Sequence, residues 1–242
     1  MQMILSATLG VAVLAMLAGC PSNESRQGGG LATQEAASTR NDTETQPSAT
    51  TDARKVQPLG KGDQAPVAIL RLPDGQEVDL ATLYNQKPSV LIFYRGGWCP
   101  YCNTHLAQIA TAEPELLAMG YQVLAISPDR PEELSKTLDK HHLTYQLLSD
   151  SDVVLARAFG LVFRVDDPTL EKYRGFGIDL EQASGRAHHL LPVPAVYIVD
   201  TQGIIQFAHW DPDYKKRLEP EALLKAARDT QSAGQPSTES RD

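Results

Sequence analysis

The strongest constraint on the fold is a buried strand that runs directly into a pair of closely spaced cysteines. Ser89–Tyr94 (SVLIFY) is an almost wholly apolar run, which is typical of a strand covered on both faces. Arg95, two glycines and a tryptophan intervene before Cys99-Pro100-Tyr101-Cys102 opens a helical pattern. Because proline favours the first helical position, Cys99 is predicted to be the N-cap and Cys102 to lie in the first turn. Unpaired N–H groups and the helix dipole favour a thiolate there, so the motif predicts reactive cysteines.

Around this motif, predicted strands alternate with predicted helices. Further strands are expected over 67–72, 77–80, 122–126, 145–148, 195–199 and 204–209. Helices are expected to begin near Pro100, Pro131, Val153 and Glu219. Strands separated by helices indicate an α/β domain with a mainly parallel sheet, here preceded by a hairpin and ending in an antiparallel pair. Phe163–His189 fits neither period and is predicted to be an insertion.

The N-terminal residues differ from the rest of the chain. The run from Met3 to Ala18 carries no charge and is too short for a membrane-spanning helix, but it fits the core of a signal peptide. Leu17–Cys20 (LAGC) resembles the lipobox of bacterial lipoproteins. That resemblance implies that residues 1–19 are removed and that the sulfur of Cys20 carries a lipid. The domain would then be anchored to a bacterial membrane and face the periplasm or the exterior. The alternative is a short core helix with a buried cysteine.

A polar tract separates this segment from the folded part. Residues 20–55 consist mostly of Ser, Thr, Gln, Asn, Glu, Gly and Ala. They hold too few apolar side chains to offset the entropy of ordering them. The sequence therefore predicts a disordered tether over residues 20–55, one globular domain over residues 56–229, and a disordered tail over residues 230–242.

Composition narrows the range of functions. Three cysteines are too few for a disulfide scaffold, and a formal net charge of −8 without a basic cluster argues against nucleic-acid binding. The Cys-x-x-Cys motif supplies two of the about four ligands that a zinc site needs, so no metal and no cofactor is predicted. A structural disulfide between Cys99 and Cys102 is the remaining alternative, although a helix N-terminus is typical of reactive pairs.

Four stretches of the domain resemble one family. FYRGGWCPYC, ISPDRPEEL, LLSDSDVVLARAFG and LPVPAVYIVDTQG are similar to the AhpC/TSA peroxiredoxin-like proteins, in the redoxin group of the thioredoxin superfamily. The resemblance implies a thioredoxin fold, with a mixed sheet in a three-layer α/β/α arrangement, and reduction of peroxides or disulfides by cysteine. It also implies that Pro194, just before the strand 195–199, is a cis-proline that faces the two sulfurs. An ordinary trans proline at the strand edge is the alternative.

The chain departs from the peroxiredoxin pattern at positions that matter for the chemistry. With the shared Phe-Tyr aligned, the family's proline, threonine and peroxidatic cysteine fall on Arg95, Cys99 and Cys102, and its later arginine falls on Pro194. A thioredoxin-like register instead makes Cys99 the attacking thiol, and the N-cap argument favours this assignment; both registers stay open. Arg95 and Arg217 could supply the missing cation, but a surface salt bridge is the expected role of each.

The sequence thus predicts a lipid-anchored thiol peroxidase of the cell envelope that reduces hydroperoxides through Cys99 and Cys102. A sulfenic acid forms on one sulfur, the other sulfur condenses with it to a disulfide, and a thioredoxin-like donor reduces the disulfide. Trp98 is expected to pack beside the cysteines and Tyr101 to face a partner. The alternatives are a thiol–disulfide oxidoreductase that acts on protein disulfides, and a redox-inert binding lipoprotein on the same scaffold.

Overall fold

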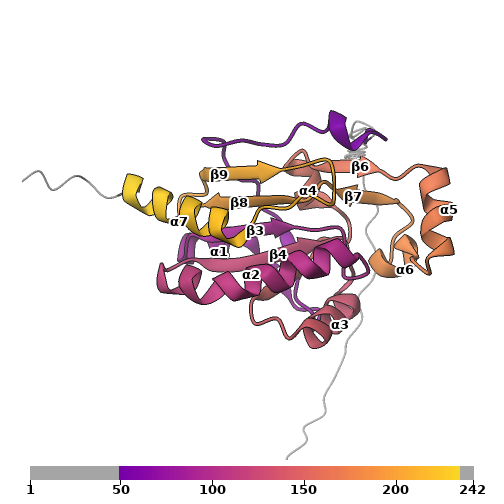
Figure 1. Ribbon diagram of the computed structural model, residues 1–242, viewed down its shortest axis with the longest axis horizontal. Helices are drawn as coiled ribbons and strands as arrows, with labels where there is room; N and C mark the ends of the chain where they lie inside the picture. Colours follow the sequence, from indigo (N-terminus) through magenta and orange to yellow (C-terminus); the bar gives the residue numbers. More distant parts are fainter. Residues whose placement is uncertain (1–48, 235–242) are drawn as a thin grey trace, which may run out of the picture. The chain divides into compact units, whose positions relative to one another are not determined.

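The computed structural model describes residues 49–234, which build a mixed β-sheet with helices on both faces (Figure 1). In spatial order the seven strands of the sheet are β2 (Glu77–Asp79), β1 (Ile69–Arg71), β5 (Gln146–Ser149), β4 (Gln122–Ser127), β3 (Ser89–Phe93), β8 (Ala195–Val199) and β9 (Ile205–Trp210). β3, β4 and β5 run parallel to one another. β8 runs antiparallel to both β3 and β9, and β1 runs antiparallel to both β2 and β5. The sheet is therefore mixed, as the resemblance implies, but the prediction of a mainly parallel sheet is wrong, because four of its six strand pairs are antiparallel.

Helices cover both faces of the sheet and complete the three layers that the sequence predicts. α2 (Pro100–Ala118), α3 (Pro131–His141) and α7 (Pro220–Gly234) cover one face, and α1 (Leu80–Gln86) and α4 (Val154–Ala158) cover the other. The central strand β3 serves both layers, because Ile92 joins the apolar cluster of α2 and Phe93 joins that of α4. This double burial explains the continuous apolar run in its sequence.

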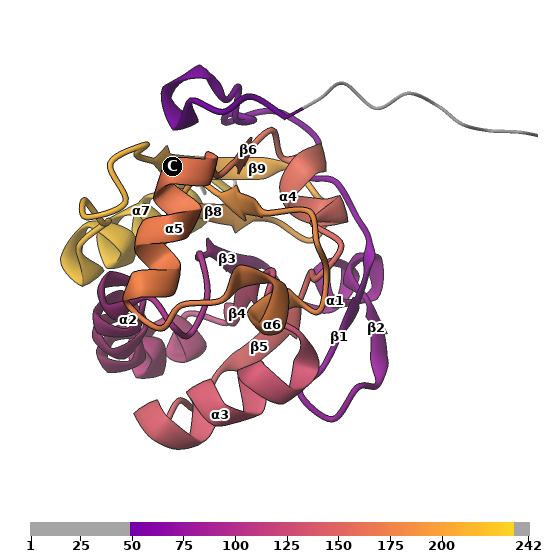
Figure 2. The same cartoon turned by 90° about the vertical axis from the view of Figure 1, so that its right-hand side faces the viewer.

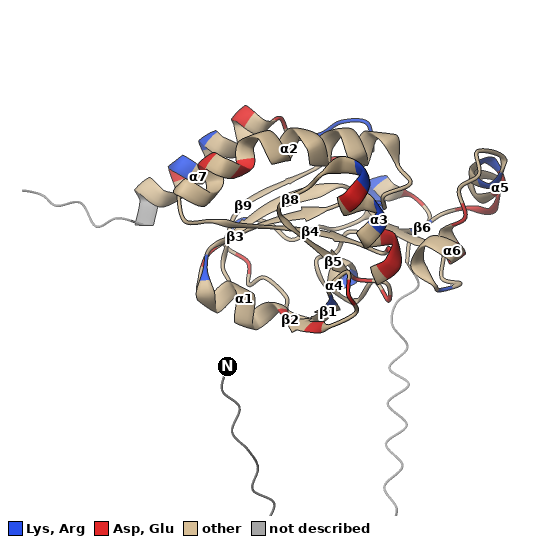
Figure 3. Ribbon diagram, turned by 90° about the horizontal axis from the view of Figure 1, so that it is seen from below, with Lys and Arg blue, Asp and Glu red and all other residues tan. Residues whose placement is uncertain are grey.

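Charged side chains of both signs are interspersed along α3 and α7 (Figure 3), so neither helix presents a face of a single charge. Between residues 49 and 234, no helix is both long enough and apolar enough to cross a membrane.

The predicted insertion has regular structure. β6 (Val162–Arg164) and β7 (Leu190–Pro192) pair antiparallel and form its stem, and α5 (Asp167–Gly175) and α6 (Leu180–Ser184) lie between them. Asp166 and Asp179 cap the two helices through their carboxylates. These helices are too short for their apolar spacing to show a period, which is why the sequence pattern missed them. Figures 1 and 2 place them beyond one end of the main sheet.

Regular structure extends beyond both ends of the predicted domain. Thr50 forms an isolated bridge with Phe163, and Ala53–Lys55 forms a short 3₁₀ helix, so the tether predicted over residues 20–55 is wrong for its last residues. Because Thr50 pairs with a residue more than a hundred positions away, the composition of its own segment does not predict this structure. At the other end α7 continues to Gly234, past the predicted end at residue 229.

The N-terminal hairpin is present but shorter than expected, and a helix follows it. Its second strand was expected over 77–80, but Leu80 begins α1. The side chain of Asp79 accepts a hydrogen bond from the backbone N–H of Ala81 and so caps the helix. The sequence did carry a signal for this helix, namely an aspartate, which favours the N-cap position, directly before an apolar residue.

Candidate active site

Two glycines shape the turn that leads from β3 to the cysteines. Gly96 has φ of +146°, and a Cβ atom there would collide with the indole nitrogen of Trp98 and with the carboxylate of Asp129. A Cβ atom on Gly97 would collide with the hydroxyl of Thr137 in α3. Because larger residues would push the neighbouring segments apart, this close approach requires glycine at both positions.

Hydrogen bonds hold the same turn on both sides. The backbone N–H of Gly97 donates to the carboxylate of Asp129 at 2.6 Å, and the amide of Asn103 donates to the carbonyl of Gly97 at 2.8 Å. Asp129 is buried at the carboxyl end of β4, and burial raises its pKa to about 7. The turn is therefore tied to α2 and to the β4–α3 connection.

Cys99 is the N-cap residue of α2 and Pro100 is its first residue, as predicted. The carbonyl of Cys99 accepts hydrogen bonds from the N–H groups of Cys102 and Asn103, each at 3.1 Å. Its sulfur makes no capping hydrogen bond, contrary to the expectation. Both cysteines are buried, since Cys99 is 2% and Cys102 0% exposed. Both sulfurs pack into the apolar cluster that lies between α2 and the sheet.

The two thiols differ in acidity. The pKa of Cys99 is lowered to about 6, first by a hydrogen bond from the Cys102 side chain and then by the positive charge of Arg95, which together outweigh burial. The pKa of Cys102 is raised well above its usual value, first by burial and then by its hydrogen bond to Cys99. At neutral pH the pair therefore holds one proton, on Cys102, and Cys99 is the thiolate.

Arg95 does not form the predicted surface salt bridge. It is 3% exposed, and no carboxylate pairs with it within residues 49–234. Its guanidinium lies 4.2 Å from the ring centre of Tyr214, 5.3 Å from that of Trp98 and 5.6 Å from that of Tyr173, and it donates a hydrogen bond to the Tyr173 hydroxyl. Aromatic faces stabilise the cation in place of a carboxylate. Its charge is therefore left available to Cys99.

Arg217 does not form the predicted surface salt bridge either. It is half-buried in the segment before α7, and its Nη2 lies 3.4 Å from the sulfur of Cys102, to which it donates. The described part of the chain supplies no carboxylate partner for it either. A surface salt bridge requires an exposed arginine, whereas the fold packs the segment of Arg217 against the start of α2.

The other residues predicted for the site are Trp98, Tyr101, Pro194 and Cys20. Trp98 packs on Tyr173 with ring centres 5.6 Å apart, and Tyr101 is 44% exposed. Pro194 precedes Ala195, which is paired with Phe93 at the end of β3, so Pro194 lies at the same end of the sheet as the turn to the cysteines. The cis geometry of its peptide bond stays a prediction. The predicted lipidation site, Cys20, lies outside the described residues.

Several residues of the site had not been singled out by sequence. Tyr173 belongs to the insertion, Tyr214 to the segment before α7, and Asp129 to the connection that follows β4. Asp129 had a usable signal, since a polar residue just after a buried strand stands at the sheet edge where helices begin. The two tyrosines had none, because their contacts depend on tertiary packing.

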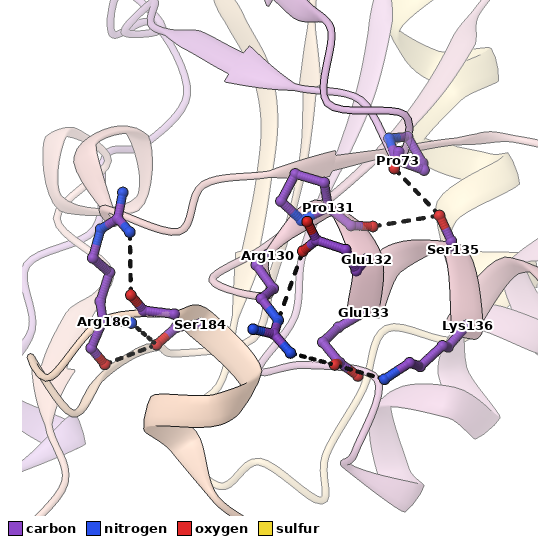
Figure 4. A network of polar contacts seen from close by, with 10 residues as sticks. Pro73, Arg130, Pro131, Glu132, Glu133, Ser135, Lys136, Ser184 and Arg186 are labelled. Atoms are coloured by element: carbon purple, nitrogen blue, oxygen red, sulfur yellow. Dashed lines mark hydrogen bonds and ion pairs between the residues drawn. The ribbon is translucent and has the colours of Figure 1, made fainter.

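A backbone hydrogen bond ties the insertion to the connection that leads into α3. The N–H of Arg130 donates to the carbonyl of Ala183 in α6 at 2.9 Å. The Arg130 side chain forms ion pairs with Glu132 and Glu133 in the first turn of α3 (Figure 4). A cavity of about 330 Å³ lies between α3 and the insertion, and its lining includes Trp98. The insertion thus lies beside the redox motif.

Comparison with known proteins supports the resemblance. The AhpC/TSA family matches residues 61–208. Peroxiredoxin Bcp of Escherichia coli (strain K12) is 36% identical over 104 residues, which are 43% of this chain and 66% of that protein. The putative peroxiredoxin bcp of Haemophilus influenzae is 35% identical over 104 residues, again 43% and 66%. The chain thus spans just under two thirds of the length of these relatives.

A solved structure shows the same architecture. Peroxidoxin BcpB from Mycobacterium tuberculosis superimposes with a TM-score of 0.56 at 20% sequence identity, and the match covers 74% of this chain and 99% of that one. At this level of identity the likeness concerns the fold alone. It confirms the predicted thioredoxin fold.

Proposed function

The chain belongs to the AhpC/TSA family, and on this premise we propose that it is a thiol peroxidase that reduces hydroperoxides through Cys99 and Cys102. The observation that carries the proposal is the arrangement of the two cysteines: Cys99 is the N-cap of α2, Cys102 lies in its first turn, and a guanidinium group donates to the Cys102 sulfur at 3.4 Å. This environment lowers the pKa of Cys99 to about 6, while burial raises that of Cys102. Thiolate is the nucleophilic form of cysteine, so Cys99 is ready to attack at neutral pH. Arg95 and Arg217 supply positive charge beside the two sulfurs.

In the first step the Cys99 thiolate attacks the distal oxygen of the hydroperoxide. The S–O bond forms as the O–O bond breaks, and the departing alkoxide or hydroxide takes a proton and leaves as alcohol or water. Cys99 is oxidised to a sulfenic acid and the peroxide is reduced. Enclosure of the sulfur by apolar side chains excludes water from the thiolate, which strengthens the effect of the nearby guanidinium groups.

In the second step Cys102 attacks the sulfenic sulfur, an S–S bond forms, and the oxygen leaves as water. Cys102 is suited to this role because it lies one helical turn from Cys99 and already hydrogen-bonds to it. A dithiol donor of the thioredoxin type then returns both sulfurs to the reduced state and is itself oxidised to a disulfide. The cycle needs no metal or organic cofactor.

Paired activity assays on the purified full chain test this proposal. Peroxide consumption is measured with thioredoxin and its reductase as donor, and insulin disulfide reduction is measured on the same preparation. The expected result is rapid peroxide turnover with poor insulin reduction, and loss of peroxide turnover in Cys99→Ser. Insulin reduction without peroxide turnover would contradict the peroxidase proposal.

A second candidate function is thiol–disulfide exchange with other proteins. It is favoured by one specific observation: the acidic thiol is the first cysteine of Cys-Pro-Tyr-Cys, where a peroxiredoxin pattern has a threonine. The reduction of insulin in the assay above would support it.

We also propose that the chain is a lipoprotein of the bacterial cell envelope, because Leu17–Cys20 resembles a lipobox. Expression in a Gram-negative host and intact-mass analysis of the membrane fraction test this. Loss of residues 1–19 with added lipid mass is expected, and Cys20→Ser should abolish both. A soluble protein that starts at Met1 and does not change with the substitution would contradict the proposal.

A further inference from the structure

Arg217 places a guanidinium group against a sulfur that is uncharged at rest. Its Nη2 donates to the Cys102 sulfur at 3.4 Å, while its Nε and Nη1 are buried and have no partner among the described residues. No carboxylate within residues 49–234 balances the charge. At rest the charge of Arg217 also lowers the pKa of the neighbouring Cys99, but the sulfur that it contacts directly is the protonated Cys102.

The anion that this arrangement fits is the thiolate of Cys102. That thiolate forms transiently when the Cys99–Cys102 disulfide is reduced, because one sulfur is attacked and the other must leave with the electron pair. Cys102 is 0% exposed, and without a nearby cation a thiolate there would be strongly disfavoured. The lower the energy of the departing thiolate, the faster the exchange.

We propose that Arg217 is a catalytic residue for the disulfide step, in which it stabilises Cys102 as the leaving thiolate during reduction by an external dithiol. This inference rests on the redox-active Cys99–Cys102 pair of the proposed function. It adds a cation in direct contact with the second sulfur, while the charge of Arg95 acts on the first.

The exchange balances in atoms and electrons. A thiolate of the donor attacks the sulfur of Cys99, a mixed disulfide forms, and the Cys99–Cys102 bond breaks with its electron pair moving onto Cys102. Cys102 then takes up a proton. The second thiolate of the donor attacks the mixed disulfide and releases the Cys99 thiolate. The donor leaves as a disulfide, having supplied two electrons.

His105 holds Arg217 in place and is a positioning residue. It lies on α2 one turn after Cys102, is buried, and its Nε2 lies 3.2 Å from the carbonyl of Leu218, the residue after Arg217. Because the partner is a carbonyl, Nε2 carries the proton and donates. Burial lowers the pKa of His105 to about 4, so the ring is neutral and does not compete with Arg217 for the thiolate.

The test follows reduction of the disulfide without using peroxide. The full chain is oxidised with the diazene oxidant diamide and mixed with excess dithiothreitol, and thiol recovery is measured by timed alkylation and mass spectrometry. Arg217→Gln is expected to slow reduction about ten-fold, since losing a charge-assisted hydrogen bond to the leaving thiolate lowers the rate by that factor or more. Arg217→Lys should restore most of the rate. Lys216→Gln, which removes the neighbouring exposed charge, is the matched control and should leave the rate unchanged.

Two further measurements separate the outcomes. His105→Gln is expected to slow reduction less than Arg217→Gln, and adding it to Arg217→Gln should have little further effect. An unchanged reduction rate in Arg217→Gln overturns the proposal. The proposal is also overturned if Arg217→Gln slows only the formation of sulfenic acid on Cys102, measured in a Cys99→Ser background. Arg217 would then act in the reaction with peroxide and not in disulfide reduction. Because the assay contains no peroxide, a slow Arg217→Gln variant supports the inference even if the wild-type chain consumes none.

Discussion

Arg95 donates a hydrogen bond to the hydroxyl of Tyr173, so the turn that follows the central strand is joined to a helix residue 78 positions later. The same tyrosine packs on Trp98 of the redox motif. One residue of the insertion therefore contacts both the cation that acts on Cys99 and the ring beside it. This makes Tyr173 the most direct point at which the insertion can influence the chemistry.

Replacing Tyr173 should change substrate selectivity. In Tyr173→Ala the loss of the ring opens the side of the turn to the cysteines, so the rate with cumene hydroperoxide should rise a few-fold relative to hydrogen peroxide. Tyr173→Phe keeps the ring, and we expect it to retain the wild-type ratio. Phe176→Ala removes a 78% exposed ring of the same insertion and serves as the control. Equal ratios in all variants would show that the insertion does not limit access.

The acidity of Cys99 should depend on the donor at position 102. Cys102→Ala removes the hydrogen bond that is the main cause of the lowered pKa of Cys99. The pH midpoint of thiolate formation, followed by ultraviolet absorbance, should rise from about 6. The thiolate fraction at neutral pH should fall accordingly. Cys102→Ser keeps a hydroxyl donor and should shift the midpoint less. A midpoint unaffected by Cys102→Ala would mean that other groups set the acidity.

Trapping identifies the attacking sulfur. With hydrogen peroxide and a dimedone-type probe, Cys102→Ser should be labelled rapidly at Cys99, because Cys99 is the more acidic thiol. Cys99→Ser should be labelled slowly, since the pKa of Cys102 is raised by burial. Mass spectrometry of the digested protein gives both rates. Fast labelling of Cys102 in the absence of Cys99 would instead favour the peroxiredoxin register.

Asp129 should make stability fall as pH rises. Burial raises its pKa from 3.8 to about 7, so between these values the folded protein holds a proton that the unfolded chain releases. Stability is therefore lost as pH increases through that window. Asp129→Asn keeps an oxygen acceptor for Gly97 without the charge. It should raise the free energy of unfolding at pH 8 by on the order of 1 kcal/mol, and by less at pH 5.

Urea unfolding at the two pH values checks this prediction. Asp139→Asn makes the same change on an exposed residue of α3 and should keep the wild-type pH dependence. An effect of Asp129→Asn that is equal at both pH values would show that the carboxyl does not titrate in this window.

Local features of the chain were enough to predict the scaffold of the site. The apolar run of β3, the two glycines and the proline after Cys99 lie within a few residues of one another, and together they predict a strand, a turn and a helix start. The contacts with Asp129 and Thr137 that require the glycines come from tertiary packing. The resemblance added the thioredoxin fold, which the solved structure confirms.

Tertiary structure decided the burial of both sulfurs and the roles of the two arginines. Surface salt bridges were the predicted role of both arginines. Instead Arg95 contacts aromatic rings from the insertion and from the segment before α7, and Arg217 donates to Cys102, 115 positions away. Burial and electrostatics depend on which segments are in contact in the folded chain, and sequence spacing does not predict contacts between distant segments. The motif alone therefore predicts that cysteines react, while packing determines which of the two is the thiolate.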